Sequence, residues 1–254
     1  MGINSPAEIL DIWIGNGVKK ANLPVYKMIV LGILAGVYIG FGVFVFTLAT
    51  SVGGDAFQSM LAKLVGAALF PVGLMLVILC GAELFTGNNL LVLALMSKKI
   101  TAGQMLRNWG VVYIANLAGS VLIAFFFARS GLLQDAAAER AVAIAVSKTS
   151  LPFSEAVVRG VLCNMLVVLA CWLQASSKEM VGKVLGIWFP IMLFVFAGFE
   201  HCVANMTYIP LSIFLGADVT WGAFIVSNLI PVTIGNLIGG AVIISGAYWL
   251  AYRK

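Results

Sequence analysis

Three ionisable residues lie inside stretches of the chain that are otherwise apolar. Glu83 follows Gly81, and Glu200 follows Gly198 and directly precedes His201, the only histidine. An ionisable group at membrane depth is costly to bury, so it faces protein or a water-filled cavity. Glycine beside such a group can end a helix, and irregular backbone at that depth is tolerated only where it is buried or lines a cavity. The pattern predicts two helix breaks at which polar groups gather.

The chemistry open to His201 is proton transfer or stabilisation of an anion, because imidazole changes its charge near neutral pH. A histidine at a helix break in a bundle of apolar helices is a functional candidate. One histidine cannot form a closed metal site, and the four cysteines lie in apolar segments without metal-ligand spacing to it. We therefore expect a pore role for His201, with no metal and no cofactor.

The glutamates are interpreted as structural residues that accept hydrogen bonds from backbone N–H groups at the breaks. An asparagine follows each glutamate by five residues, and glycines flank both breaks. The predicted helix-break residues are Glu83, Glu200, Gly81, Gly87, Gly198, Asn88 and Asn205. Thr86 lies in the first break, where its hydroxyl could either contact a polar solute or cap a half-helix.

The two halves of the chain repeat these features in the same order. Besides the two breaks, a Trp-Gly pair recurs, and an asparagine follows each tryptophan by seven residues: Asn116 follows Trp109, and Asn228 follows Trp221. We interpret Asn116 and Asn228 as equivalent. Each half contains three crossings, so the second half starts on the opposite side of the membrane. This arrangement predicts an inverted-topology repeat.

Six apolar regions supply the elements that must position these residues. They are 28–50, 60–96, 108–128, 155–176, 184–214 and 221–251. The chain is 62% hydrophobic and 10% charged, whereas a soluble domain carries about 25% charged residues. The second and fifth regions exceed the roughly 20 residues that one crossing needs, and they hold the two breaks. We predict an all-α membrane protein of one domain, 1–254, with six transmembrane helices in an inverted 3+3 repeat, 28–128 and 155–251.

A polar leader precedes the first apolar region and is predicted to form an amphipathic helix over 5–20. Ser5 and Glu8 have the spacing of a capping box, and Pro6 stands at the first helical position. Such a helix could lie on the cytoplasmic membrane surface or pack against a neighbouring subunit.

The basic residues set the orientation of the chain. Ten Lys and Arg residues fall on the side of the N-terminus and five on the other side, so the positive-inside rule places both termini in the cytoplasm. The net charge of +5 does not indicate a nucleic-acid partner, because these residues lie in short segments between apolar regions.

Four motifs carry a resemblance to a known family. They are LCGAELFTG (Leu79–Gly87), GVLCNMLVVLA (Gly160–Ala170), EHCVANM (Glu200–Met206) and NLIPVTIGNLIGG (Asn228–Gly240). They resemble the signatures of the formate/nitrite transporter family, and the similarity runs through essentially the whole chain. Within that family, hydrosulfide and formate channels look closer than nitrite channels. The resemblance implies an aquaporin-like protomer with broken second and fifth helices, assembled as a homopentamer in the cytoplasmic (inner) membrane with a pore in each subunit.

The resemblance also implies the pore residues. A central histidine lies between two apolar constrictions in this family, and His201 matches it. The implied pore and substrate positions are His201, Thr86, Lys148, Asn164 and Asn228, with Lys148 in the outer vestibule and both asparagines facing the histidine. The implied constriction positions are Leu84, Phe194, Phe70 and Leu74.

We therefore expect a channel for small monovalent anions, hydrosulfide or formate, in which His201 assists passage of the anion or of the neutral acid. Its partners would be further copies of itself, membrane lipid, the anions and protons. A nitrite or short-chain carboxylate transporter of the same family is the alternative. A neutral-solute facilitator of aquaporin type would carry paired Asn-Pro-Ala motifs, but Asn205 is followed by Met206. An enzyme would need a nucleophile–base or metal arrangement, and no serine lies near His201 in the sequence.

Overall fold

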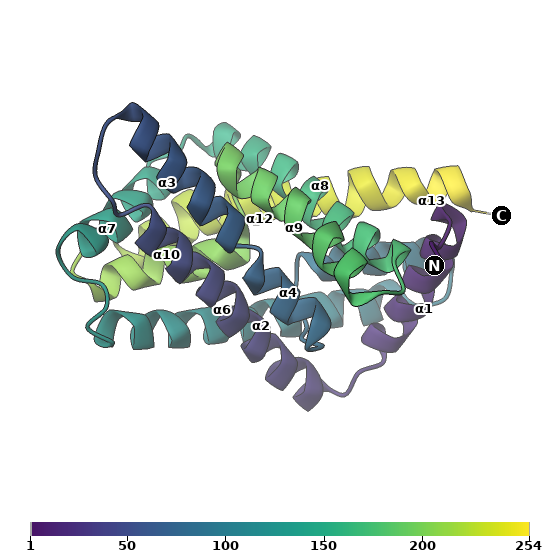
Figure 1. Ribbon diagram of the computed structural model, residues 1–254. Coiled ribbons are helices and arrows are strands. Elements are labelled where there is room, and N and C mark those ends of the chain that lie inside the picture. The colour runs from purple at the N-terminus through teal and green to yellow at the C-terminus, as the bar shows by residue number, and fades with distance from the viewer. Residues whose placement is uncertain (1, 254) are drawn as a thin grey trace.

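The computed structural model describes residues 2–253, and the secondary structure of that part of the chain is helical apart from one isolated bridge. Six helices are long and apolar enough to cross a membrane: Val25–Ala49, Ala56–Leu79, Ala102–Arg129, Phe153–Ser176, Met180–Ala197 and Trp221–Tyr252. Two shorter apolar helices, Gly87–Met96 and Cys202–Phe214, follow the second and the fifth. The predicted all-α class with six membrane-spanning helices is confirmed. Both termini lie at the same end of the molecule (Figure 1).

The first half contains α2 (Val25–Ala49), α3 (Ala56–Leu69), α4 (Val72–Leu79), η1 (Gly87–Leu90), α5 (Leu91–Met96) and α6 (Ala102–Arg129). The second half contains α8 (Phe153–Ser176), α9 (Met180–Ala197), α10 (Cys202–Phe214), α11 (Trp221–Ala223), η2 (Phe224–Leu229), α12 (Ile230–Leu237), η3 (Ile238–Ser245) and α13 (Gly246–Tyr252). The segment from α11 to α13 is one continuous helical path in which η2 and η3 are π-helical turns.

Both predicted helix breaks are present. α4 ends shortly before Gly81, which has φ +85°, and α9 ends at Gly198, which has φ +78°. Glycine adopts this left-handed region without the steric cost that a Cβ would add. Gly87 opens η1, and an added Cβ there would meet only the sulfur of Cys171, at an ordinary 3.5 Å. The first two glycines are therefore required by backbone conformation, whereas Gly87 is not.

Close helix crossings bring the breaks together. A Cβ on Gly119 would fall on the carbonyl oxygen of Ile33, and a Cβ on Gly235 would fall on that of Val157. Small residues at such positions let helix backbones approach one another. α6 thus packs tightly on α2, and α12 packs tightly on α8.

Two further helices, α1 (Pro6–Ala21) and α7 (Asp135–Thr149), lie at opposite ends of the molecule (Figure 1). The capping box is present in α1, where Ser5 Oγ accepts from the Glu8 N–H at 3.4 Å and Glu8 Oε2 accepts from the Ser5 N–H at 2.7 Å. The two placements considered for this helix were the membrane surface and a neighbouring subunit. Its apolar face, which includes Leu10 and Trp13, is instead buried against α5, α8 and α13 of its own chain.

α7 was not predicted; it lies between the apolar regions 108–128 and 155–176. Its alanine-rich sequence favours a helix, because alanine has the highest helix propensity. Ala141, Ile144 and Ala145 are buried, and the helix packs on α10. The segment is too polar to read as a membrane crossing, and so its helical character was missed.

Candidate functional site

His201 lies at the second break with both ring nitrogens in hydrogen bonds. Its Nδ1 accepts from the Ala204 N–H at 3.1 Å, so the imidazole caps the N-terminus of α10. Its Nε2 lies 2.8 Å from Oγ1 of Thr86, which belongs to the first break. His201 is 3% exposed and Thr86 is fully buried. The two breaks therefore meet at one buried contact between an imidazole and a hydroxyl.

These two hydrogen bonds determine which ring nitrogen carries the proton. A backbone N–H can only donate, so Nδ1 of His201 is the unprotonated acceptor. In the neutral ring the proton is then on Nε2, which donates to Oγ1 of Thr86. A protonated imidazole would point an N–H at the Ala204 N–H. Charging His201 therefore requires this cap to open.

A buried apolar cluster borders the ring of His201. The rings of Phe70 and Phe194 meet edge to face with centroids 5.8 Å apart, and the Phe194 ring lies 5.9 Å from that of His201. Leu74 and Leu84 belong to the same buried cluster. These four apolar residues are between 2% and 3% exposed. The structure thus places the four expected constriction residues in one buried apolar cluster, in which the Phe194 ring lies beside that of His201.

Two cavities lie on either side of this cluster. The inner cavity, at the end that holds both termini, has a volume of about 960 Å³ and is lined by Leu74, Leu84 and residues of α1. The outer cavity, of about 250 Å³, is lined by Phe70, Phe194, His201 and residues of α7. α1 and α7 lie at opposite ends of the bundle (Figure 1). Leu74 and Leu84 thus line the inner cavity, whereas Phe70, Phe194 and His201 line the outer one.

Glu83 forms the centre of a buried polar cluster at the first break. Its Oε1 accepts from Lys20 Nζ at 2.6 Å, and its Oε2 accepts from Asn88 Nδ2 at 2.7 Å. Asn88 Nδ2 also donates to Asn108 Oδ1 at 2.8 Å, and Asn108 Nδ2 donates to the backbone oxygen of Lys20 at 3.1 Å. The carboxylate is thus paired with a lysine from α1.

Glu200 forms an equivalent cluster at the second break. Its Oε1 accepts from Lys148 Nζ at 2.9 Å, and its Oε2 accepts from Asn205 Nδ2 at 2.7 Å. Asn205 Nδ2 also donates to Asn228 Oδ1 at 2.8 Å, and Asn228 Nδ2 donates to the backbone oxygen of Lys148 at 2.9 Å. The lysine here comes from α7. The four bonds named in each cluster use the same residue types and the same atoms, but Lys20 Nζ also donates to Asn88 Oδ1 at 3.0 Å, whereas Asn205 Oδ1 has no partner among residues 2–253.

The predicted role of the glutamates as acceptors from the backbone N–H groups is wrong. Asparagines outside the two glutamate clusters bind the backbone at the breaks. Asn116 Oδ1 accepts from the Phe85 N–H at 2.9 Å, and its Nδ2 donates to the carbonyl oxygens of Gly32 and Glu83 at 2.8 and 2.9 Å. The glutamate carboxylates instead accept from lysine and asparagine side chains. A charged carboxylate gains more from an ammonium partner than from a neutral N–H.

Asn236 does the same at the second break. Its Oδ1 accepts from the Cys202 N–H at 2.9 Å, and its Nδ2 donates to the carbonyl oxygens of Gly160 and Glu200 at 2.8 and 2.9 Å. Asn236 is therefore the equivalent of Asn116 in the second half.

The predicted pairing of Asn116 with Asn228 is accordingly wrong, since Asn228 corresponds to Asn108. The two registers differ by the eight positions from Asn228 to Asn236, about two helical turns, so helical periodicity distinguishes them poorly. The Trp-Gly pairs that suggested the pairing are not equivalent. Trp109 Nε1 donates to the backbone oxygen of Asn88, whereas Trp221 is 43% exposed.

Two expected neighbours of the histidine lie elsewhere in the hydrogen-bond network. Asn164 Nδ2 donates to Asn89 Oδ1 at 2.9 Å and to the backbone oxygen of Asn236 at 2.7 Å. Asn228 belongs to the Glu200 cluster. Among residues 2–253, neither asparagine forms a hydrogen bond with His201. Both support the helices around the histidine instead of contacting its ring.

Sequence reasoning missed Lys20 and Asn108. The signal for Lys20 was present, because Lys20 precedes Lys148 by the same number of positions that separates Gly32 from Gly160. Lys20 was read only as a determinant of orientation. An alignment of the two halves that began in the leader would have identified it.

With this geometry in place, comparison with known proteins identifies the family. A family model described as formate/nitrite transporter matches residues 7–250. The chain belongs to the formate/nitrite transporter family. The match covers both breaks, five membrane-spanning helices and all but the last two residues of the sixth, so the resemblance seen in the four sequence motifs is confirmed.

Members of the formate/nitrite transporter family align with this chain over nearly its full length. An uncharacterized transporter, YrhG of Bacillus subtilis, is 45% identical over 100% of this chain and 96% of its own. The formate channel BtFdhC of Bacillus thuringiensis is 40% identical over 100% of this chain and 98% of its own. A solved pentameric formate channel with formate bound has a TM-score of 0.80 at 34% identity and covers 91% of this chain and 98% of its own.

Proposed function

We propose that this chain is a channel through which formate, or a similar small monovalent anion, crosses the cytoplasmic membrane. The observation that supports it most is the His201–Thr86 contact, buried within an apolar cluster between two cavities. Related chains are formate channels, and a solved relative holds formate. We therefore assign transport, and not catalysis, to the histidine.

The charge around both cavities supports an anionic substrate. The outer cavity is lined by four basic side chains, those of Lys63, Arg140, Lys148 and Arg159, and by a single carboxylate, Glu200. The inner cavity is lined by three lysines and one carboxylate, Glu83. A cleft of one charge sign raises the local concentration of ions of the opposite sign. Anions would therefore collect at both ends of the passage.

In the central step, the anion loses its hydrating water between the apolar rings. The free-energy cost of this dehydration is large for a charge that has no partner. We infer that neutral His201 and Thr86 offset this cost by hydrogen bonding to the passing solute. The hydroxyl of Thr86 can rotate its own hydrogen toward the solute while its oxygen accepts from Nε2. This route leaves the cap on α10 in place.

Proton transfer is the second route, and it has a structural cost. A protonated His201 could give the Nε2 proton to formate, which would then pass the apolar ring as the neutral acid. The proton left on Nδ1 would face the Ala204 N–H, so the cap would stay open until that proton departed. The hydrogen bond at Nδ1 therefore favours the first route over the second.

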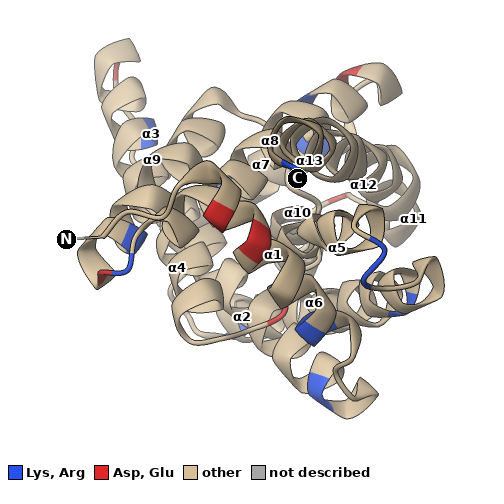
Figure 2. Ribbon diagram, turned by 90° about the vertical axis from the view of Figure 1, so that its right-hand side faces the viewer, with Lys and Arg blue, Asp and Glu red and all other residues tan. Residues whose placement is uncertain are grey.

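The setting of the channel is part of the proposal. We propose a homopentamer with a pore in each subunit, and we place both termini in the cytoplasm. The end of the molecule that holds both termini carries basic segments on α6 and in the loop after α5 (Figure 2). Excess lysine and arginine on one face is typical of the cytoplasmic side.

Flux into proteoliposomes tests the function. Purified protein is reconstituted, and uptake of formate, hydrosulfide, nitrite and glycerol is followed by stopped flow against empty vesicles. We expect saturable uptake of formate and little uptake of glycerol. Faster uptake of hydrosulfide or nitrite than of formate would reassign the substrate to another anion of the same family. Glycerol crossing as readily as the anions would overturn the anion assignment.

A further inference from the structure

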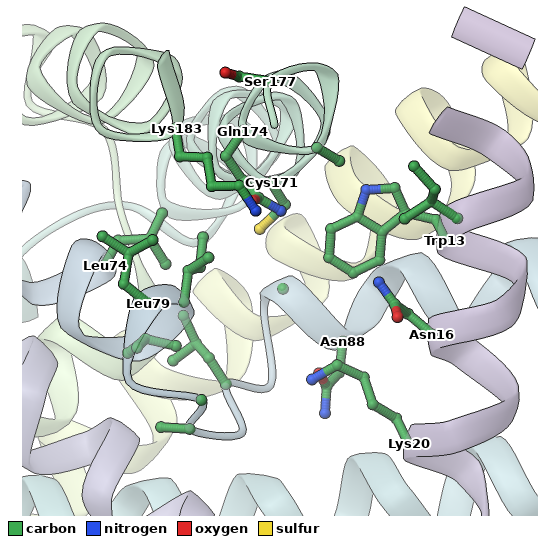
Figure 3. Close-up of a pocket in the computed structure, with 18 of the residues that line it drawn as sticks. Trp13, Asn16, Lys20, Leu74, Leu79, Asn88, Cys171, Gln174, Ser177 and Lys183 are labelled. Atoms are coloured by element: carbon green, nitrogen blue, oxygen red, sulfur yellow. The ribbon is translucent and has the colours of Figure 1, made fainter. Parts of the chain in front are cut away.

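The short helix η1 carries two adjacent asparagines that belong to different hydrogen-bond networks. Asn88 lies beside Lys20 at the inner cavity (Figure 3). Asn89 is fully buried and is not among the residues that line this cavity. Its Nδ2 donates to the carbonyl oxygen of Phe85 at 3.1 Å, and its Oδ1 accepts from Nδ2 of Asn164 on α8 at 2.9 Å. The first break is therefore tied to α8 through Asn89, outside the two glutamate clusters.

Asn164 carries this connection on to the second break. Its Nδ2 also donates to the backbone oxygen of Asn236 at 2.7 Å, and Oδ1 of Asn236 accepts from the Cys202 N–H at 2.9 Å. In the sequence, Phe85 directly precedes the hydroxyl residue of the buried pore contact, and Cys202 directly follows its histidine. A series of amides thus links the backbone beside the hydroxyl to the backbone beside the imidazole.

The two ends of this connection fix the orientation of both amides. A carbonyl oxygen can only accept, so Nδ2 of Asn89 must face Phe85 and Nδ2 of Asn164 must face Asn236. Oδ1 of Asn89 is then left to accept from Asn164. Rotating either amide by half a turn would bring two oxygens together. Oδ1 of Asn164 has no partner among residues 2–253, so this side chain serves the connection only as a donor.

The second break has no counterpart of Asn89 in the sequence. The register that pairs the two glutamates also pairs three sets of unlike residues: Leu84 with His201, Thr86 with Val203, and Asn89 with Met206. The thioether of methionine cannot donate a hydrogen bond. A side chain that every break needs for its shape would recur, as the asparagines of the glutamate clusters do. Asn89 is instead unmatched, like the hydroxyl and the imidazole of the pore contact.

We propose that Asn89 and Asn164 are positioning residues that hold Oγ1 of Thr86 within hydrogen-bond distance of Nε2 of His201. The proposal rests on the transport function proposed above for the use that is made of this contact, and it gives neither asparagine a contact with the solute. The two pore atoms lie 2.8 Å apart on separate breaks. Such a bond weakens steeply when its length or angle changes, so the breaks must be kept from sliding past each other. The buried amide connection resists that movement.

The single histidine of the chain makes the contact directly observable. Full-length protein without a histidine tag is prepared with 15N-labelled histidine, so every labelled signal belongs to His201. In wild type we expect an unprotonated Nδ1 and a strongly hydrogen-bonded Nε2–H. Asn89→Ala and Asn164→Ala should both move the Nε2–H proton resonance upfield, as expected for a weaker hydrogen bond. A wild-type resonance in both variants would overturn the positioning role.

Two glycines supply a milder disturbance and its matched control. A Cβ on Gly240 would fall on Nδ2 of Asn164 and lie 2.9 Å from Oδ1 of Asn89, whereas a Cβ on Gly246 would meet nothing within 4 Å. Both glycines belong to the last helical path. Gly240→Ala should move the Nε2–H resonance in the same direction as Asn164→Ala, and Gly246→Ala should leave it at the wild-type position. Equal spectra for the two glycine variants would overturn the proposal, even where an asparagine variant does not assemble.

Formate flux separates positioning from a general structural role. If Asn89 acts through Thr86, Asn89→Ala should lower formate uptake by no more than Thr86→Val does. It should add no further loss in a Thr86→Val background, because the contact is already absent there and the two effects are coupled. Losses that add in the double variant would show that Asn89 acts elsewhere.

The positioning role and the transport function fail in different ways. An Nε2–H resonance that responds to Asn89→Ala, in a protein that carries no formate into vesicles, would leave the positioning role intact and refute the function. Formate uptake together with a resonance that does not respond to Asn89→Ala, Asn164→Ala or Gly240→Ala would do the reverse.

Discussion

A single backbone hydrogen bond constrains the chemistry of His201. Nδ1 is occupied by the N–H of Ala204, and so the ring presents Nε2–H to Thr86. The Ala204 N–H at the start of α10 occupies Nδ1, so Nδ1 can bind a second proton only when this hydrogen bond breaks. The state of the first turn of α10 and the charge of the ring are therefore coupled.

Replacing His201 with asparagine separates capping from titration. Asparagine is a good N-cap residue, so its side-chain oxygen can accept from Ala204, yet it does not titrate. Because the favoured route keeps His201 neutral, we expect the variant to assemble normally and to carry formate with the same dependence on pH as wild type between pH 5 and 8. Uptake into proteoliposomes across that range is the measurement. A flattened pH profile in the variant would instead support the proton-transfer route.

Thr86 allows a matched pair of substitutions. Thr86→Val keeps the shape and removes the acceptor for Nε2–H of His201, whereas Thr86→Ser keeps the hydroxyl. A buried donor left without its acceptor costs about 1–3 kcal/mol. We expect formate flux through Thr86→Val to fall about tenfold and Thr86→Ser to stay near wild type. Equal flux in the two variants would show that the hydroxyl is dispensable.

His201 and Thr86 were identifiable from the sequence, because the chain has only one histidine and it lies in a glycine-flanked break. Lys20 and Asn108 were not, since both looked ordinary for their positions. A lysine in a leader is usually a marker of orientation, and an asparagine near a helix end is usually solvated. Their role depends on α1 folding back over the first break, a tertiary contact that local sequence does not encode.

At the scale of elements, glycine crossings set how closely helices approach. Gly119→Ala would place a methyl group on the Ile33 carbonyl oxygen, whereas Gly110→Ala on the same helix meets nothing within 4 Å. Overpacking costs about 1–3 kcal/mol, while alanine at the open position gains up to about 1 kcal/mol in helix propensity. We expect Gly119→Ala to unfold in detergent at a lower temperature than wild type, and Gly110→Ala to unfold at the same or a higher temperature. The opposite order would contradict the crossing geometry.

The stability of the first turn of α1 depends on pH. Hydrogen bonds from the backbone N–H and hydroxyl of Ser5 hold the pKa of Glu8 below its ordinary value. A lowered carboxyl pKa stabilises the folded turn above the unfolded pKa of about 4.3, and this contribution is lost as pH falls through the lowered pKa. We expect amide exchange in the first turn, corrected for intrinsic rates, to speed up over that interval. Glu8→Gln should show no such change, and a response identical to wild type would rule out Glu8 as its cause.

The membrane-spanning helices and both breaks were predictable, since hydropathy and glycine placement are local signals. Two features were not. α7 is amphipathic and too polar to count as a crossing, and its burial depends on α10. The register of the repeat was misjudged because asparagine occurs twice on the last helix of each half, and only the hydrogen bonds of Asn116 and Asn236 show which positions correspond.

At the scale of the whole molecule, the proposed pentamer is open to direct measurement. Native mass spectrometry of the detergent-solubilised protein should give about five times the chain mass of 26.9 kDa. Exposed apolar residues occur along α3, including Phe57, Met60 and Leu61, and subunit contacts would cover part of such surface. A dominant mass of one or two chains would contradict the pentamer but would leave the proposed pore within each subunit open.

The lysines that face Glu83 and Glu200 come from α1 and α7, which are not among the six candidate spans. A polypeptide shortened to begin at α2 would retain every candidate span but leave the Glu83 carboxylate, beside the inner cavity, with the neutral amide of Asn88 as its remaining partner. N-terminal truncation should therefore weaken the first break while leaving the sequence of each span unchanged. A shortened chain that keeps this ion pair must start upstream of Lys20, and each half depends on its own additional helix, α1 or α7, for the lysine.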